Sequence, residues 1–486
     1  MSPGLTWLLG AVIVFYVAGM YGLAFAVRGR IHSTEDFLVA GRRLPLSLAW
    51  ATLLATWFGA GTILVVTEEV TREGFRRAAL DPIGAGFCLI LAGFFFAKPL
   101  WKMSLLTLGD FFRRRFGPTA EILSACIMVP TYFGWVAAQL VALAGLLELF
   151  FGIDPQVGIL LVAVVAMGYT LLGGMWSVTL TDAFQIVLVL AGLVVLVVTV
   201  LGRLGDGSIY LGLLRLKEGT PAEMLVVIPT DSFRSFVEWI AIFCVGALGN
   251  IPGQDLMQRI FAAKSATVAQ WAAVIAGIAY LTFGLLPILL GLAARLLVPE
   301  QVTGAILPAL ASLFLSPAIL VVFTVALVSA VLSTIDSAIL SPASVLSQNV
   351  FQRFNRDRID SLTLNRIAIV IVTAGSVAFA FMGESAYALL EDAYELPLVG
   401  LFVPLALGLK AKSPRERAAI ASMLVGTGLW LVHYAAGWEY FLEPLASEWK
   451  AYLPVSLSIA LVSLLAYLIG NAGRPNDETR SNPPPR

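Results

Sequence analysis

Histidine, cysteine and charged residues are all scarce in this sequence. Only two of its 486 residues are histidines, and neither a GxxxxGK[ST] nor an HExxH pattern occurs. ATP hydrolysis and zinc-dependent catalysis therefore have no residues to carry them, and we do not expect an enzyme. The three cysteines lie in apolar runs without CxxC spacing, which is typical of small buried side chains.

Charged residues make up 13% of the chain and hydrophobic residues 59%, with a mean hydropathy of +0.89. This composition is typical of a polytopic membrane protein embedded in a lipid bilayer. Apolar stretches long enough to cross a hydrocarbon layer of ~30 Å predict an all-α fold with thirteen transmembrane helices. Their approximate ranges are 5–27, 46–67, 82–98, 119–150, 156–173, 180–202, 235–258, 268–296, 305–345, 365–383, 387–409, 416–437 and 453–471. We expect one transmembrane domain over residues 1–472 and a disordered cytoplasmic tail over residues 473–486.

The distribution of basic residues predicts the orientation of the chain. If the N-terminus lies outside, 22 of the 31 Lys and Arg residues fall on the inner side of the membrane. Because basic loops stay in the cytoplasm, we expect an outside N-terminus and a cytoplasmic C-terminus in the cell (inner) membrane. The formal net charge is zero, and nothing in the sequence indicates a nucleic-acid partner.

Ten predicted helices, in residues 46–409, form two halves of five, with the helix 5–27 and the helices of 416–471 at the periphery. Since five is odd, the two halves would be inverted relative to each other in the membrane. The first helix of each half is interrupted by small residues, at Gly59-Ala60-Gly61 and in residues 246–253. Paired broken helices favour a transporter binding site in a 5+5 inverted repeat, because unwound backbone at mid-membrane is tolerated only beside a cavity. Close helix packing is the alternative explanation for these small residues.

Polar side chains interrupt the apolar run 305–345 near its middle. On a helix, Ser333, Asp336 and Ser337 share one face, with Thr334 beside it. Hydroxyl and carboxylate oxygens can replace the water around a hard monovalent cation, so this segment predicts a cation-binding helix of a transporter. A carboxylate at a helix centre costs roughly 2.5–3.5 kcal/mol, and no basic residue of the same or a neighbouring run stands at similar depth. Asp336 is therefore expected to hold a cation or a proton.

Other charged residues allow more than one interpretation. Asp182, at the cytoplasmic start of the helix 180–202, could cap that helix or neutralise a cation passing to the cytoplasm. Asp255 and Arg259 stand four residues apart, which favours an ordinary structural ion pair. Three acidic residues at the outer start of the helix 387–409 form either a solvated rim or an outer vestibule that concentrates cations. They are Glu391, Asp392 and Glu395.

Four segments in this order resemble the sodium:solute symporter family, which includes sodium/proline, sodium/pantothenate and sodium/glucose transporters. The segments are Ser33-Thr-Glu-Asp-Phe-Leu-Val-Ala-Gly-Arg42, Gly173-Gly with Thr181-Asp182 and Gln185, Gln258-Arg259-Ile-Phe-Ala-Ala-Lys264, and Ala330 with Ser333-Thr334 and Ser337. The similarity covers nearly the whole chain. It implies the inverted-repeat fold of the leucine-transporter type and sodium as the coupling ion.

The resemblance also implies a sodium site between the broken first core helix and the eighth core helix. Trp57, Ala60 and Ala330 would contribute backbone carbonyls, while Ser333 and Thr334 would supply hydroxyls. This set joins two predicted helices that are far apart in the sequence.

Some relatives hold a second sodium ion, and the matching positions here are Asp182, Ser333, Asp336 and Ser337. The chain departs from that pattern, because Asp336 stands where such relatives have a hydroxyl. Its carboxylate would either strengthen a second cation site or carry a proton if it lies close to Asp182.

For the solute, the resemblance points to side chains of the broken helices and of the third and tenth core helices. These are Phe58, Thr62, Gln139, Asn250, Gln254 and Tyr394. Together they predict a sodium-coupled symporter that imports a small polar organic solute by alternating access. Two alternatives stay open: a proton-coupled symporter of the same fold, and a transporter-like membrane sensor that acts with a separate signalling partner. The sequence does not indicate the oligomeric state.

Overall fold

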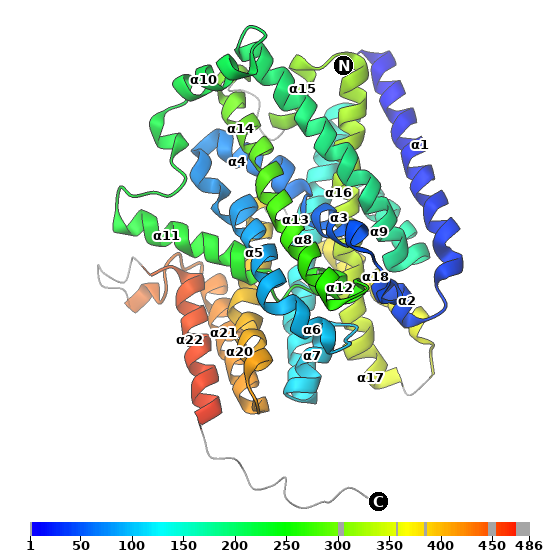
Figure 1. The fold of residues 1–486 in the computed structure, drawn as a ribbon, viewed down its shortest axis with the longest axis vertical. Coiled ribbons are helices and arrows are strands. Elements are labelled where there is room, and N and C mark those ends of the chain that lie inside the picture. The colour runs from blue at the N-terminus through cyan, green and yellow to red at the C-terminus, as the bar shows by residue number, and fades with distance from the viewer. Residues whose placement is uncertain (1, 300–305, 356–357, 383–385, 446–452, 473–486) are drawn as a thin grey trace, which may run out of the picture.

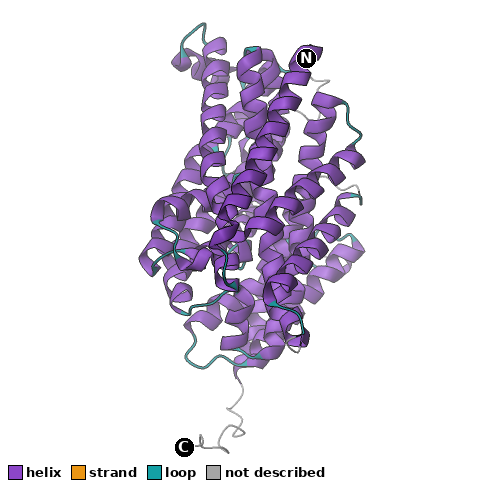
Figure 2. Ribbon diagram, turned by 90° about the vertical axis from the view of Figure 1, so that its right-hand side faces the viewer, coloured by secondary structure: helices purple, strands orange, loops and turns teal. Residues whose placement is uncertain are grey.

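The computed structural model describes residues 2–299, 306–355, 358–382, 386–445 and 453–472. These residues form helices and connecting loops and no β-strand, as Figure 2 shows, apart from one isolated bridge between Leu44 and Ala263. The all-helical fold predicted from composition is therefore confirmed for the described part of the chain. The predicted tail, residues 473–486, lies outside the described residues.

The α-helices follow one another along the chain with short connections. Up to residue 219 they are α1 (Pro3–Val27), α2 (Thr34–Val39), α3 (Leu46–Trp57), α4 (Val66–Glu73), α5 (Ala85–Leu91), α6 (Lys98–Lys102), α7 (Leu108–Arg115), α8 (Pro118–Phe151), α9 (Pro155–Leu204) and α10 (Ile209–Gly219). Beyond it they are α11 (Phe233–Cys244), α12 (Gln254–Ala262), α13 (Ala266–Phe283), α14 (Leu285–Leu297), α15 (Ile306–Phe314), α16 (Pro317–Val345), α17 (Gln352–Asn355), α18 (Ser361–Ala380), α19 (Ala386–Pro397), α20 (Val403–Lys410), α21 (Glu416–Ala436) and α22 (Val455–Ala472).

Wider and tighter helical turns connect these elements. The π-helical segments are η3 (Gly61–Val65), η5 (Leu80–Gly84), η6 (Ala92–Ala97), η8 (Val245–Gly249), η9 (Leu346–Phe351) and η10 (Leu398–Phe402). The 3₁₀ turns are η1 (Arg28–Arg30), η2 (Ala40–Arg42), η4 (Phe75–Ala79), η7 (Ala222–Leu225) and η11 (Glu443–Leu445). Three of the π-helical segments, η3, η5 and η8, lie beside the candidate site, as π-bulges frequently do.

The helices are long and apolar enough to cross a membrane many times. Ten described helices meet this condition, and two bent pairs raise the number to twelve. α9 counts once among them although it has 50 residues and a break at Gly174. A straight helix of this length would extend about 75 Å, more than twice the ~30 Å hydrocarbon layer. The prediction of thirteen spans requires α9 to cross twice, and it stays a prediction.

Both predicted helix breaks are present. α3 and the helical turns from Gly61 to Glu73 meet at an angle of 56°, and α11 with η8 meets α12 at 41°. In the first break Phe58 leaves the helical conformation, with φ −82° and ψ 56°. Gly59 follows, where a Cβ atom would collide with the side chain of Thr334 on α16. The small residue therefore permits a close approach of α16 to the break.

α16 is the most enclosed long helix, and the terminal helices are peripheral. Every residue of α16 from Phe323 to Val345 is buried, and it packs against α9, α8 and α3. In contrast, only 17% of the most apolar 18-residue stretch of α1 is buried. The corresponding share for α22 is 22%. Figure 1 shows α1 and α22 at opposite edges of the bundle. α1 and α22 are therefore the least enclosed of the described apolar helices, and the predicted division into a core of residues 46–409 and peripheral helices stays a prediction.

Candidate functional site

The hydroxyl groups of α16 meet the break after α3. Thr334 lies against Gly59, and its Oγ1 donates to the carbonyl of Ala330 one turn earlier at 3.2 Å. Gln139 also lies close to Gly59, and its Oε1 accepts from the backbone N–H of Ala60 at 2.8 Å. A hydroxyl and unwound backbone therefore come together deep in the protein, where water is excluded.

Asp182 is fully buried within α9 and holds two other helices together. Ser333 on α16 donates to its Oδ1, and Thr52 on α3 donates to its Oδ2. The carboxylate makes these contacts inside a continuous helical stretch, so it does not cap a helix N-terminus. Of the two interpretations of Asp182, the structural cap is therefore wrong.

Arg259 is the basic residue that the sequence analysis did not place at this depth. It lies on α12 and is 1% exposed, and its Nη2 donates to Oγ of Ser337 at 2.6 Å. The same nitrogen lies 3.9 Å from Oδ2 of Asp182. The only contact of the guanidinium with Asp255 is through the backbone: Nη1 of Arg259 donates to the carbonyl of Asp255 at 3.2 Å. The predicted Asp255–Arg259 ion pair is therefore wrong, because the guanidinium turns toward α16 and α9.

Asp336 adds a second carboxylate to this buried group. Its Oδ1 accepts from Ser337 at 3.2 Å, whereas its Oδ2 has no hydrogen-bond partner. Both Asp182 and Asp336 are fully buried. If both are ionised, two negative charges face the single positive charge of Arg259, and one charge stays uncompensated. The group can therefore take up one further cation or proton.

A small cavity between the two broken helices is lined by aromatic rings and a carboxylate. Asp255 accepts from Nε1 of Trp57 at 2.5 Å and from the hydroxyl of Tyr132 at 2.6 Å. The cavity has a volume of about 30 Å³. Its lining also includes Trp135, Asn250 and Tyr394. Asn250 and Tyr394 are thus the two predicted solute residues that border this cavity.

The other four predicted solute residues do not line this cavity. They are Phe58, Thr62, Gln139 and Gln254. Gln254 connects the backbone N–H of Leu108, at 2.7 Å, with the hydroxyl of Ser344, at 3.0 Å. Thr62, on η3, donates to a carboxylate oxygen of Asp81 at 3.0 Å. The structure therefore separates the predicted set into residues beside the cavity and residues that join helices.

Asp81 and Tyr280 are polar residues of the site region that the sequence analysis missed. Asp81 stands one residue before the predicted span 82–98, where a carboxylate needs no special explanation. In the structure the helical segment already begins at Phe75, which places Asp81 inside it, 7% exposed. The Asp81-Pro82 pair at the start of an apolar run was the one sequence feature that could have indicated a buried carboxylate. Nothing in the sequence distinguishes Tyr280 from a tyrosine that only packs against its neighbours.

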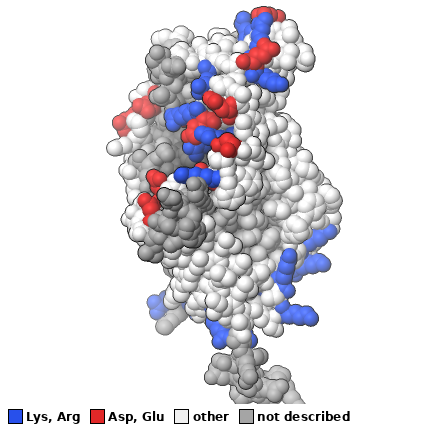
Figure 3. Space-filling view, turned by 90° about the vertical axis from the view of Figure 1, so that its left-hand side faces the viewer, with Lys and Arg blue, Asp and Glu red and all other residues white. Residues whose placement is uncertain are grey.

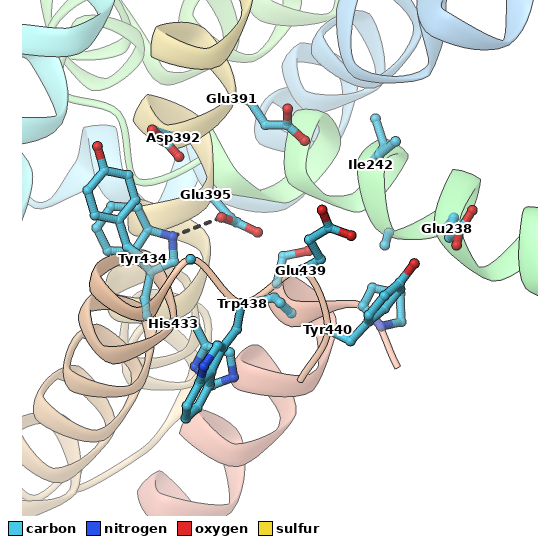
Figure 4. A pocket seen from close by; sticks show the side chains of 16 residues that line it. Glu238, Ile242, Glu391, Asp392, Glu395, His433, Tyr434, Trp438, Glu439 and Tyr440 are labelled. Carbon is cyan, nitrogen blue, oxygen red and sulfur yellow. Dashed lines mark hydrogen bonds between the residues drawn. The ribbon is translucent and has the colours of Figure 1, made fainter. Parts of the chain in front are cut away.

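A larger acidic cavity opens between α11, α19 and the C-terminal end of α21. It has a volume of about 510 Å³ and is lined by Glu238, Glu391, Asp392 and Glu395 among others. Figure 4 shows the acidic side chains pointing toward the same space as several aromatic rings. Nε1 of Trp430 donates to Oε2 of Glu395 at 2.8 Å. These carboxylates therefore line a cavity, and its role as an outer vestibule stays a prediction.

Two matched broken helices, one of which meets a buried row of hydroxyls, define a class of membrane transporters built on an inverted repeat. Within that class, the chain belongs to the sodium:solute symporter family, whose model matches residues 37–426. The family and the named relatives are transporters, so the protein is not an enzyme.

The comparisons extend over most of the chain. The human protein named high affinity choline transporter 1 is 29% identical over 462 residues, covering 90% of this chain and 78% of its own. The sodium/glucose cotransporter of Vibrio parahaemolyticus is 24% identical, covering 87% of this chain and 84% of its own. A solved Na⁺-coupled sialic acid symporter matches with a TM-score of 0.75 at 18% identity over 95% of this chain and 96% of its own. Mhp1, a nucleobase-cation-symport-1 family transporter, matches with a TM-score of 0.59 at 16% identity. This match covers 89% of this chain and 93% of its own. These two structures show the shared fold.

Proposed function

We propose that the protein is a sodium-coupled secondary active symporter that imports a small organic solute by alternating access. The observation that carries this proposal is the contact of Thr334 with Gly59, where the hydroxyl row of α16 meets the broken helix α3. An ion held at this contact would bridge two helices that separate when the transporter changes its conformation. Membership of the sodium:solute symporter family supports sodium as that ion.

Ala60, Ala330, Ser333 and Thr334 are the proposed sodium ligands. The fifth predicted ligand, the carbonyl of Trp57, accepts from the hydroxyl of Tyr280 at 3.0 Å and is treated separately below. Sodium that enters from outside would join α3 to α16 and stabilise the outward-open state. The membrane potential would add about 2.3 kcal/mol per charge for each 100 mV to the ion gradient.

A positively charged solute fits the cavity at Asp255 best. The carboxylate of Asp255 forms no ion pair among the described residues, and the rings of Trp57, Tyr132, Trp135 and Tyr394 surround it. A desolvated cation gains about 2 kcal/mol or more over an aromatic face. At about 30 Å³ the cavity would have to widen for any solute, which is expected of a site that opens and closes. The relatives named choline transporters support a small organic cation as the solute.

Charge on the two ends of the molecule supports the proposed orientation. The lowest part of the face in Figure 3 carries Lys and Arg without a visible acidic side chain, and the acidic residues lie higher. A basic end is the end expected in the cytoplasm. The acidic cavity of Figure 4 would then belong to the entrance side, where its carboxylates raise the local concentration of cations.

Replacement of both α16 hydroxyls tests the sodium site. Ser333→Ala together with Thr334→Ala should abolish sodium-stimulated uptake in sealed vesicles, because two of the proposed ligands are lost. The control is Thr373→Ala with Ser376→Ala on α18, since these buried hydroxyls donate only to carbonyls of their own helix. Radiolabelled choline, with and without a sodium gradient, is the probe for uptake. Unchanged sodium stimulation in the α16 double variant would contradict the proposed site.

The proton-coupled alternative has one observation in its favour, the unpartnered Oδ2 of fully buried Asp336. A proton on this oxygen would remove the uncompensated charge beside Asp182 and Arg259. Uptake that follows a pH gradient in sodium-free buffer, and that Asp336→Asn removes, would favour this alternative over sodium coupling.

A further inference from the structure

Five oxygen atoms crowd together beside the break after α3. Both carboxylate oxygens of Asp81 lie 3.0 and 3.1 Å from Oγ1 of Thr62, and 2.9 and 3.1 Å from the hydroxyl of Tyr280. The carbonyl of Trp57 lies 3.0 Å from the Tyr280 hydroxyl and 3.3 Å from Thr62 Oγ1. The two hydroxyls also contact each other. These five oxygens are the Asp81 cage.

The Asp81 cage has too few hydrogen atoms for its contacts. The hydroxyls of Thr62 and Tyr280 supply one hydrogen each, while a carboxylate and a carbonyl supply none. Only two hydrogen atoms are therefore available for seven oxygen–oxygen contacts within hydrogen-bond distance. The remaining approaches bring lone pairs together, which is unfavourable unless a positive charge lies among them.

No described ion pair brings a positive side chain to the cage: Arg77 borders the adjacent cavity, but its guanidinium pairs with Glu73 and Glu69. Asp81 is 7% exposed, Thr62 and Tyr280 are fully buried, and none of the ion pairs among the described residues includes Asp81. This is the opposite of the group at Asp182, where Arg259 approaches the carboxylate. A buried carboxylate without a basic partner needs a bound cation or a proton.

The space beside the cage is the size of a single ion or water molecule. A cavity of about 10 Å³ lies next to Asp81 and is bordered by Gly61, Glu69, Arg77 and Tyr394 among others. About this volume is the minimum for one water-sized probe, so in this conformation the cavity suits a single ion or water molecule. Carbonyl, hydroxyl and carboxylate oxygens are the ligands that a dehydrated alkali ion prefers.

We propose that the Asp81 cage binds a second sodium ion, distinct from the ion at Ser333 and Thr334. The proposal rests on the proposed sodium symport and adds a site to it. Trp57 connects this site to the solute cavity, because its carbonyl belongs to the cage while its indole N–H donates to Asp255. Tyr394 borders both cavities. Sodium at the cage therefore fixes the conformation of the solute cavity, and each ligand strengthens the binding of the other.

The sodium-to-solute flux ratio tests the second site. Purified protein in proteoliposomes is compared with Asp81→Asn, in which the amide donates hydrogens to the crowded oxygens but lacks the negative charge. The ratio of ²²Na⁺ to choline flux should fall about twofold in Asp81→Asn, because one of two ion sites is lost. The control is Asp154→Asn, since Asp154 caps the exposed N-terminus of α9, where Asn serves equally well. A thermal-shift titration with sodium chloride against potassium chloride, without solute, should show a weaker sodium response for Asp81→Asn.

The outcomes separate the inference from the proposed function. If the wild-type protein shows neither sodium-stimulated choline uptake nor a sodium-dependent thermal shift, the proposed symport itself is wrong. If the wild-type protein is sodium-coupled but Asp81→Asn keeps its flux ratio and its sodium-dependent thermal shift, the cage holds no sodium. Loss of proton co-transport in Asp81→Asn with an unchanged sodium ratio would assign a proton to Asp81 and overturn the proposal. Tyr280→Phe, which removes one ligand and no charge, should lower the sodium affinity while the folded protein persists.

Discussion

Arg259 places a permanent positive charge in the buried group of α9, α12 and α16. A guanidinium stays protonated in proteins and is tethered to its helix, so it cannot leave as an ion does. Its Nη2 reaches Ser337 at 2.6 Å and Asp182 at 3.9 Å, two of the residues predicted for a second cation. Part of the charge that a second sodium ion would provide there is therefore already present. Asp81, which has no such tethered charge among the described ion pairs, is therefore the better place for a second ion.

Asp255 should decide whether the solute is a cation. Asp255→Asn keeps the size of the side chain and an acceptor for Trp57, but it removes the negative charge. We expect KM for choline to rise at least tenfold, which corresponds to about 1.4 kcal/mol of lost interaction. The measurement is the initial rate of radiolabelled choline uptake against concentration at saturating sodium.

Two variants control this experiment. Asp360→Asn removes an exposed carboxylate that caps α18, and Trp271→Phe changes an aromatic ring that is 47% exposed. Both should leave KM unchanged. An equal KM in Asp255→Asn and the wild-type protein would show that the carboxylate does not face the solute charge.

At the residue scale, the sequence predicts the hydroxyl row but not its partners. Ser333, Asp336 and Ser337 lie on one helical face, so their common direction follows from local geometry. Asp81 and Tyr280, in contrast, are 199 residues apart and meet only through the packing of separate helices. The depth of Arg259 is likewise hidden from the sequence, because the hydropathy of α12 alone does not reveal the helices that cover it.

The break in α9 is the element that places Asp182 beside α3 and α16. Gly174 has φ +50° and ψ −150°, a conformation that L-residues rarely adopt. A Cβ atom there would lie 2.7 Å from both the ring and the carbonyl of Phe37. Glycine is therefore required on two independent grounds, backbone conformation and space.

Gly174→Ala should destabilise the protein by roughly 1–3 kcal/mol, because the strained backbone persists and Phe37 must move. The apparent midpoint of thermal unfolding in detergent measures this effect. Gly145→Ala in α8 is the matched control, since nothing lies within 4 Å of a Cβ atom there and alanine favours a helix. A drop of the midpoint in Gly145→Ala as large as that in Gly174→Ala would contradict the assigned role of the break.

Element positions were predictable where the signal is local. The glycines of each broken helix lie within a few residues of one another in the sequence, and both breaks are found where the sequence predicts them. The end of the second broken helix was less accessible to prediction. All nine residues of α12, Gln254 to Ala262, are buried by neighbouring helices, although the predicted span ended at residue 258.

Charge asymmetry and the number of crossings are properties of the whole molecule. Figure 1 shows the N-terminus and α10 at one end, while α22 ends toward the opposite end. Termini at opposite ends require an odd number of crossings. The ten continuous helices and two bent pairs give twelve, and a second crossing by α9 would give thirteen.

The sidedness of the two ends of α9 decides between one crossing and two. With an outside N-terminus, two crossings place Asp154 and Lys217 on the same outer side, whereas one crossing places Lys217 in the cytoplasm. In a background with the three native cysteines replaced by alanine, Asp154→Cys and Lys217→Cys should both react with a membrane-impermeant maleimide on intact cells. Lys412→Cys, in the predicted cytoplasmic loop before α21, should react only after permeabilisation. Labelling of Lys217→Cys only after permeabilisation would reduce α9 to one crossing and would remove the inversion of the two halves, on which the pairing of the broken helices depends.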